Sequence, residues 1–209
     1  MNSCLNASGV HRAVVRLVFP AGLAPGEGRS DGNHSGIARN GAGQPVLRGS
    51  SVAGVLRHAF AAHHDDPAFD RDELDAVLDE WFGTAIDQGD GWPSQLRNTD
   101  VLLDVGSAED SVIRHHNSID RHTGSARDGG LFAIDALPPG TEGTLVLVVC
   151  SDRPNARGFL ESLLDAIASG VTFGGHGARG IGHAEIKHAD VETFDLADPE
   201  QFGSWLDDS

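Results

Sequence analysis

The sequence predicts an α+β domain of the ferredoxin-like (RRM-like) type, because its regular segments follow the order strand, helix, strand, strand, helix, strand. In this βαββαβ arrangement an antiparallel sheet of four strands is covered by helices on one face. The 209 residues suffice for one well-cored domain with large insertions, and we expect a single domain over 1–209. The pattern is interrupted by two expected insertions, at about 22–44 and 106–143, and is followed by an acidic C-terminal extension at about 190–209.

The first expected strand and helix lie on either side of the first insertion. Residues 11–19 are rich in β-branched side chains and end at Pro20, which predicts a strand. The insertion at 22–44 is glycine-rich and has no periodicity, and loops of this length in a compact domain are often functional. Ser50 or Ser51 suits a helix N-cap, because a serine oxygen can accept a free backbone N–H of the first turn. Apolar residues then recur at helical spacing: Val52, Val55, Leu56, Ala59 and Phe60.

The remaining elements follow from similar patterns. Gly83 suits the position after a helix C-terminus, so the second helix should end just before it. The expected segments are a helix over 70–82, a strand over 99–105, a central strand over 144–150, a helix over 159–168 and a last strand over 181–188.

The charge balance argues against a free-standing nucleic-acid binder. Acidic residues number 31 against 15 lysines and arginines, a net charge of −16, whereas phosphate binders are usually basic. Arginines and histidines nevertheless gather in 29–57 and 113–127, so an acidic body with local basic grooves can still bind RNA. The chain has no long apolar stretch and no basic, apolar leader at its start, so we expect no membrane partner and a cytoplasmic location.

Three segments have the chemistry to contact a phosphate backbone. PVLRGSSVAGVLR at 45–57 places small residues at a helix N-terminus, which attracts anions, and Arg48 and Arg57 add positive charge. IRHHNSIDRHTGSAR at 113–127 is dense in hydrogen-bonding groups. FGGHGARGIG at 173–182 combines little side-chain bulk with many N–H groups. The last segment lacks the Lys-Ser/Thr ending of a P-loop and follows a helix, which argues against a nucleotide hydrolase.

The order of these motifs resembles the RAMP superfamily, the repeat-associated proteins of CRISPR systems. The matching elements are LRGSSVAGVLR at 47–57, SIDRHTGSARDGGLF at 118–132 and GGHGARGIG at 174–182, and WFG at 81–83 looks like the family's close of the second helix. Two positions depart from the family pattern: Ala53 replaces a usual lysine, and Arg48 replaces a usual proline.

The resemblance implies a backbone subunit of a type III CRISPR effector complex. In such a complex, copies of the chain stack into a filament that holds a guide RNA, and the inserted hairpin acts as a thumb that interrupts guide–target pairing. The implied partners are guide RNA, complementary target RNA, further copies of the chain and other effector subunits. By matching position, the residues expected to bind RNA are Arg48, Ser50, Ser51, Arg57, Asp120, Arg121, Thr123, Gly174, Gly175, Arg179 and Gly180.

Cleavage of target RNA is a separate question. Target-cleaving members of the family carry an aspartate in the loop after the first strand, and the matching position here falls near Asn33 or His34. Asp31 can substitute as the carboxylate and His34 can act as a base, so these two are the candidate catalytic residues. A divalent ion, Mg²⁺ or Mn²⁺, would assist if the chain cuts RNA, but no resident metal site is expected. We expect a binding role in preference to cleavage.

Two alternatives stay open. One is a guide-processing endoribonuclease that acts alone, for which His34 is the one obvious catalytic candidate in a chain without tyrosine. The other is an assembly protein that binds no RNA and uses its glycine segments for packing. Recognition of bases by stacking on the sheet face is disfavoured, because aromatic residues make up only 6% of the chain.

Overall fold

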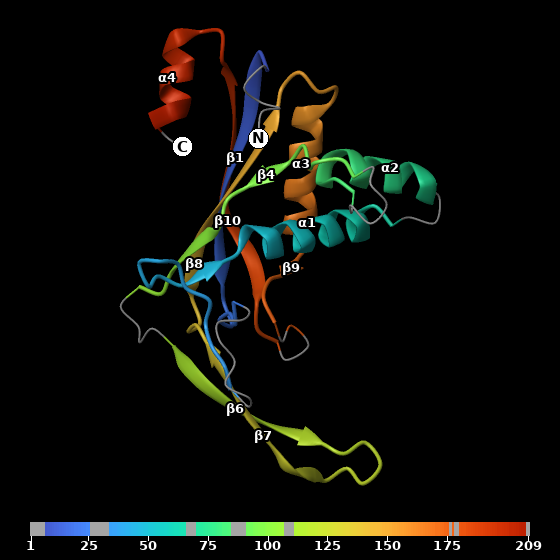
Figure 1. The fold of residues 1–209 in the computed structure, drawn as a ribbon, viewed down its shortest axis with the longest axis vertical. Coiled ribbons are helices and arrows are strands. Elements are labelled where there is room, and N and C mark those ends of the chain that lie inside the picture. Colours follow the sequence, from blue (N-terminus) through green and yellow to red (C-terminus); the bar gives the residue numbers. More distant parts are fainter. Residues whose placement is uncertain are drawn as a thin grey trace.

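The protein is an α+β structure built on an antiparallel sheet, as the sequence predicts (Figure 1). The computed structural model describes residues 7–25, 34–65, 70–84, 91–106, 111–175, 177 and 180–207. Within these residues no helix is long and apolar enough to cross a membrane.

The main sheet has seven strands, and β1 (Gly9–Phe19) lies near its centre. β1 pairs antiparallel with β8 (Thr141–Cys150) on one side and with β10 (His183–Asp195) on the other. The strand order is β3-β5-β8-β1-β10-β9, and β4 also pairs with β8. The shorter strands are β3 (Val46–Leu47), β4 (Arg97–Asn98), β5 (Val101–Asp104) and β9 (Val171–Thr172).

Three helices pack with the sheet into one core: α1 (Gly49–His63), α2 (Arg71–Phe82) and α3 (Ala156–Ala168) (Figure 1). Alternate residues of β1 are buried in this core because successive side chains of a strand point to opposite faces. These buried residues are Ala13, Val15, Leu17 and Phe19. α3 contributes apolar residues at helical spacing, namely Phe159, Leu160, Leu163 and Ile167.

Aromatic side chains join the helices to one another. The Trp81 ring of α2 stacks on the Phe159 ring of α3 with 4.3 Å between centroids and 7° between planes. Phe60 of α1 lies 5.3 Å from the same Phe159 ring. All three side chains are buried, so Phe159 links α1 and α2 to the helix that lies between β8 and β10.

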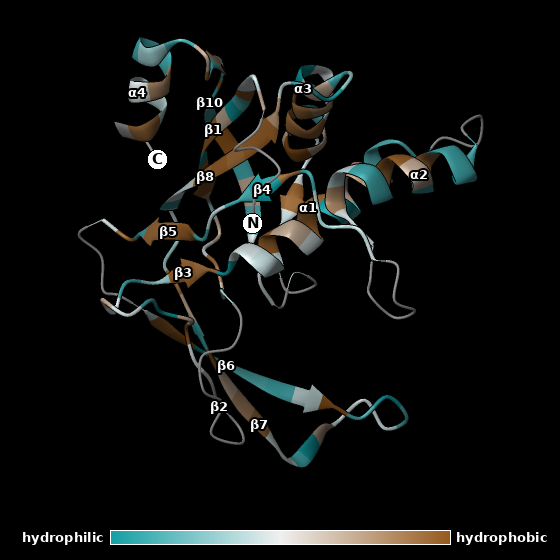
Figure 2. Cartoon of the chain, turned by 45° about the horizontal axis from the view of Figure 1, so that its top comes forward, coloured by the Kyte–Doolittle hydropathy of each residue, from teal (hydrophilic) through white to brown (hydrophobic). Residues whose placement is uncertain are grey.

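The second expected insertion forms a hairpin that projects away from the main sheet, at the opposite end of the molecule from the C-terminal helix α4 (Pro199–Asp207) (Figure 1). Its strands are β6 (Val112–Ile119) and β7 (Ala126–Ala136), and β2 (His34–Ser35) pairs parallel with β7. The outer part of the hairpin, including the turn, is largely hydrophilic (Figure 2). At its base, Ile134 is buried with Ala24 and Ile181, so the hairpin is anchored to the main sheet by an apolar contact.

The structure corrects the predicted start of α1. Arg48 is the N-cap residue and makes no side-chain cap bond, and the helix begins at Gly49. The predicted serine cap is therefore wrong, because Ser50 and Ser51 lie inside the first helical turn. Serine is not needed there, since the carboxylate of Asp100 accepts the N–H of Gly49 at 2.7 Å.

Element boundaries also differ from those expected. The insertion expected at 106–143 ends earlier, because the first residues of β8, from Thr141, pair with the end of β1. β4 and β5 divide the strand expected over 99–105. The acidic extension expected at 190–209 contains the last part of β10 and α4, and apolar side chains of α4 such as Phe202 and Leu206 are 39% and 51% exposed.

Replacing Trp81 with alanine should lower the free energy of unfolding by about 3–5 kcal/mol, because the change removes a buried aromatic ring and leaves a cavity beside Phe159. Urea denaturation followed by far-ultraviolet circular dichroism measures this loss. Trp92→Ala is the matched control, because Trp92 is 71% exposed, and its effect should stay within about 0.5 kcal/mol. Equal losses for the two variants would contradict the central role of the Trp81–Phe159 stack.

Candidate functional site

Two segments singled out in the sequence meet at one groove. The groove is lined by Pro25, Ala38, Leu47, Arg48, Ser51, Val55 and Gly174, and its volume is about 420 Å³. We call it the Arg48 groove. Arg48 and Ser51 come from the start of α1, and Gly174 comes from the glycine-rich segment before β10. The fold therefore brings together motifs that are far apart in the chain.

A second groove continues along α1. It has a volume of about 890 Å³ and lies between α1, the end of α3 and β9, with Ser51 and Val55 shared with the Arg48 groove. Small residues of α1, such as Gly54 and Ala62, form part of its wall, and His58 and His63 add polar groups. α1 is therefore a common wall of two adjoining grooves.

The glycine-rich segment is seated against the loop that follows β1. Gly174 has a φ of +75°, and a Cβ atom there would lie 2.1 Å from the carbonyl oxygen of Ala24. The N–H of Gly175 donates to the same carbonyl at 3.1 Å. Glycine is required at position 174 because both the backbone conformation and the close approach exclude a side chain.

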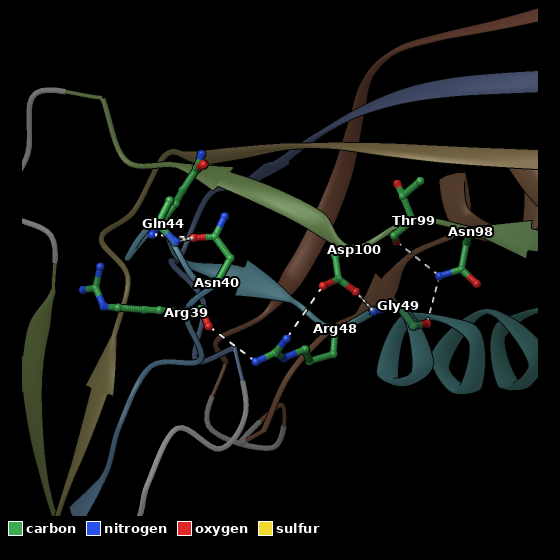
Figure 3. Close-up of polar contacts among 9 residues, drawn as sticks. Arg39, Asn40, Gln44, Arg48, Gly49, Asn98, Thr99 and Asp100 are labelled. Carbon is green, nitrogen blue, oxygen red and sulfur yellow. Dashed lines mark hydrogen bonds and ion pairs between the residues drawn. The ribbon is translucent and has the colours of Figure 1, made fainter. Parts of the chain in front are cut away.

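Arg48 is held at the mouth of the groove by two weak contacts (Figure 3). Its Nη1 lies 3.9 Å from Oδ2 of Asp100, and its Nη2 donates to the carbonyl of Arg39 at 3.4 Å. The second carboxylate oxygen of Asp100 accepts the Gly49 N–H, and the Asn98 amide donates to the Gly49 carbonyl at 2.8 Å. The first N–H of α1, which the sequence suggests as an anion donor, therefore already binds a carboxylate of the chain itself.

Arg57 has a different environment from Arg48. Its Nη1 donates to the carbonyls of Leu78 and Gly83, at 3.1 and 2.8 Å, and its Nη2 donates to Oδ1 of Asp79 at 2.9 Å. These bonds satisfy carbonyls at the C-terminal end of α2 and tie that helix to α1. Arg57 lines neither groove, so the structure gives it a stabilising role and does not bring it to Arg48.

The predicted thumb residues form the turn of the β6–β7 hairpin. Oδ1 of Asp120 accepts the backbone N–H groups of His122 and Thr123 at 2.8 and 3.1 Å. The N–H of Gly124, with a φ of +69°, donates to the Asp120 carbonyl at 2.8 Å. Bonds from the N–H groups of Thr123 and then His122 hold the pKa of the Asp120 carboxyl below its usual range. Asp120 and Thr123 therefore shape the turn, while Arg121 is exposed beside them.

The remaining predicted residues are covered only in part. Asp31 and Arg179 lie outside the described residues, and for His34 only the backbone is described, in β2 beside Ala133 of β7. Gly180 has a φ of +77°, and its N–H donates to the carbonyl of Gly177 at 2.9 Å. In the described part of the chain, no group of three or more histidine, cysteine, aspartate or glutamate side chains is arranged to hold a metal ion.

The sequence analysis did not identify Asp100 and Asn98 as site residues. The available signal is the polar run Asn98-Thr99-Asp100 directly before the apolar strand β5. A polar run at a strand end is common, and only the pairing of β3 with β5 places this one beside the start of α1.

A family model gives the chain its relationship to known proteins. The model of the RAMP superfamily matches residues 17–185, a range that includes α1, the β6–β7 hairpin and the glycine-rich segment. The chain belongs to the RAMP superfamily. The resemblance seen in the three motifs is thereby confirmed at the level of the family.

Solved structures of low sequence identity share the fold of this RAMP protein. A chain of a type IV-B CRISPR complex is 21% identical with a TM-score of 0.58, and the match covers 87% of this chain and 90% of that one. A chain of the type III-B Cmr-beta complex bound to cognate target RNA is 12% identical with a TM-score of 0.64, covering 84% and 96%. Comparison with curated proteins finds no match.

Gly174→Ala should lower the free energy of unfolding by about 2 kcal/mol or more, because alanine is strained at positive φ and its Cβ would overlap the Ala24 carbonyl. Thermal unfolding followed by circular dichroism measures the effect. Gly175→Ala is the control, because a Cβ at Gly175 meets no atom within 4 Å, and its cost should stay below about 0.5 kcal/mol. A stable Gly174→Ala protein would show that the close approach is not required.

Asp120→Ala should speed hydrogen exchange at the backbone amides of His122 and Thr123, because it removes the carboxylate that accepts both. Asp128→Ala, an exposed change in β7, should leave these two rates unaltered. Since the pKa of Asp120 is lowered in the folded chain, its contribution is complete above the ordinary aspartate range and is lost as pH falls through the lowered pKa. Exchange rates that ignore the Asp120 change would rule out this role in the turn.

Proposed function

We propose that this RAMP protein is an RNA-holding subunit of a CRISPR effector complex and that guide-RNA phosphates lie in the Arg48 groove. The observation that carries the proposal is the meeting of Arg48, Ser51 and Gly174 in one groove. The family membership and the fold shared with chains of CRISPR complexes support it.

The chemistry of the groove suits a sugar-phosphate chain. The Arg48 side chain is 56% exposed and is held only by long contacts, so its guanidinium can turn toward a phosphate. Ser51 is exposed on the same wall and supplies a hydroxyl donor. On the facing wall Gly174 has no side chain, which lets an RNA backbone come close to the protein backbone. Contacts of this kind hold RNA without reading its sequence, as a subunit serving many guides requires.

The arrangement of strands supports the finer structural part of the proposal. The strand order β5-β8-β1-β10, with α1 after β1 and α3 after β8, is the order of a ferredoxin-like fold. We place the protein in the backbone of a type III complex, where further copies and other effector subunits contact it. The projecting β6–β7 hairpin is the proposed thumb, with the Asp120 turn at its tip between guide and target RNA.

The proposed role is binding and does not involve RNA cleavage. Arg57 is left out of the RNA surface because its guanidinium binds the end of α2. A net charge of −16 means that the local cation at Arg48 acts against a repulsive background, so RNA binding should weaken steeply with added salt.

Arg48→Gln should weaken binding of a labelled single-stranded RNA about fivefold to tenfold at low salt, because one charge-assisted phosphate contact is lost. Fluorescence anisotropy across a salt series measures both the affinity and its salt dependence, and the slope should fall by about one. Arg16→Gln is the matched control: Arg16 is an exposed arginine of β1 that does not line the groove, so its loss should change binding little.

Either of two results would overturn the proposal. The first is the absence of RNA binding by the unmodified chain at low salt, both alone and in complex with co-expressed effector subunits and a repeat-spacer transcript. The second is an equal loss for Arg48→Gln and Arg16→Gln, which would indicate a general charge effect and no phosphate site at the groove.

A further inference from the structure

We propose that Asp100 sets the affinity of the Arg48 groove for RNA by competing with phosphate for the Arg48 guanidinium. The inference rests on the proposed function, because it concerns the same groove. It assigns a role to a residue that lies outside the RAMP motifs of the sequence.

The contacts of Asp100 divide between a firm one and a weak one. Oδ1 accepts the Gly49 N–H at 2.7 Å, whereas Oδ2 lies 3.9 Å from Nη1 of Arg48 (Figure 3). The Arg48 and Asp100 side chains are 56% and 46% exposed, so solvent reaches both members of the pair. An exposed ion pair of this length is weak, and Arg48 can leave it at little cost.

A bound phosphate and Asp100 then make opposite demands on the same cation. The firm bond to Gly49 keeps the carboxylate in place when Arg48 turns away, because Gly49 is fixed at the start of α1 and Asn98 holds its carbonyl at 2.8 Å. Only Arg48 changes partner. Phosphate must therefore take the guanidinium from a carboxylate that stays beside it, and the two anions repel each other.

This competition favours a polymer over a single phosphate. One phosphate at Arg48 gains only the difference between two similar anionic partners. A polynucleotide gains the same small difference and adds contacts with the neighbouring walls of the groove, Ser51 and the Gly174 backbone. Asp100 is thus an affinity-determining residue that lowers retention of free nucleotides and short fragments.

Asp100→Asn tests the role, because the amide oxygen can still accept the Gly49 N–H while the negative charge is removed. Binding of labelled single-stranded RNA at low salt should tighten about threefold, and the gain should disappear at high salt where charges are screened. Asp104→Asn is the matched control. Asp104 also accepts a backbone N–H, from Gly106 at 2.8 Å, but it lies about 13 Å further along the extended chain, so its loss should change affinity little.

A double-mutant cycle with Arg48→Gln separates competition from general repulsion. If Asp100 acts through Arg48, the threefold gain of Asp100→Asn is absent in the Arg48→Gln background. A gain that persists there, or equal affinities for Asp100→Asn and Asp104→Asn, overturns the inference while leaving RNA binding intact. An unmodified chain that binds no RNA overturns the proposed function as well, so the two failures are distinguishable. Thermal unfolding of each variant confirms that the fold is kept.

Discussion

The site depends on the contact between the backbone of Gly174 and the carbonyl of Ala24. No side chain fits between them, and the Gly175 N–H bonds to the same carbonyl. Because this contact seats the glycine-rich segment on the loop after β1, it sets one wall of the Arg48 groove. The Gly182 N–H, which donates to the carbonyl of Gly22 at 2.9 Å, fixes the other end of the segment before β10 begins.

Charge is divided in this protein between residues that hold the fold and residues that stay available. Arg57 satisfies carbonyls at the end of α2, and Arg12, only 6% exposed, pairs with Glu192 and lies 4.9 Å from the Phe194 ring centroid. Arg48 differs because it is exposed, loosely paired and placed on a groove. In a chain with a net charge of −16, the position of a few arginines decides where an anion can bind.

The site was predictable from the sequence only in part. Arg48, Ser51 and Gly174 could be selected because they stand in motifs with glycine and small residues, whose use near phosphates has a general physical reason. Arg57 stands in the same motif, yet its partner is the end of α2, and spacing along the chain carries no information on such a tertiary hydrogen bond. Asp100 could not be selected, since its role arises from the pairing of β3 with β5.

By itself, the sequence determined the α+β class, the order of the main elements, the projecting insertion and the family, because periodicity, turn residues and motif order are local signals. Only the tertiary structure decided the start of α1, where the Asp100 carboxylate binds the first N–H and no serine cap forms. It also decided that Arg57 stabilises α2 while Arg48 faces a groove. The physical reason is that a side chain's role depends on which acceptors lie near it in space, and those acceptors come from distant segments that meet only in the folded chain.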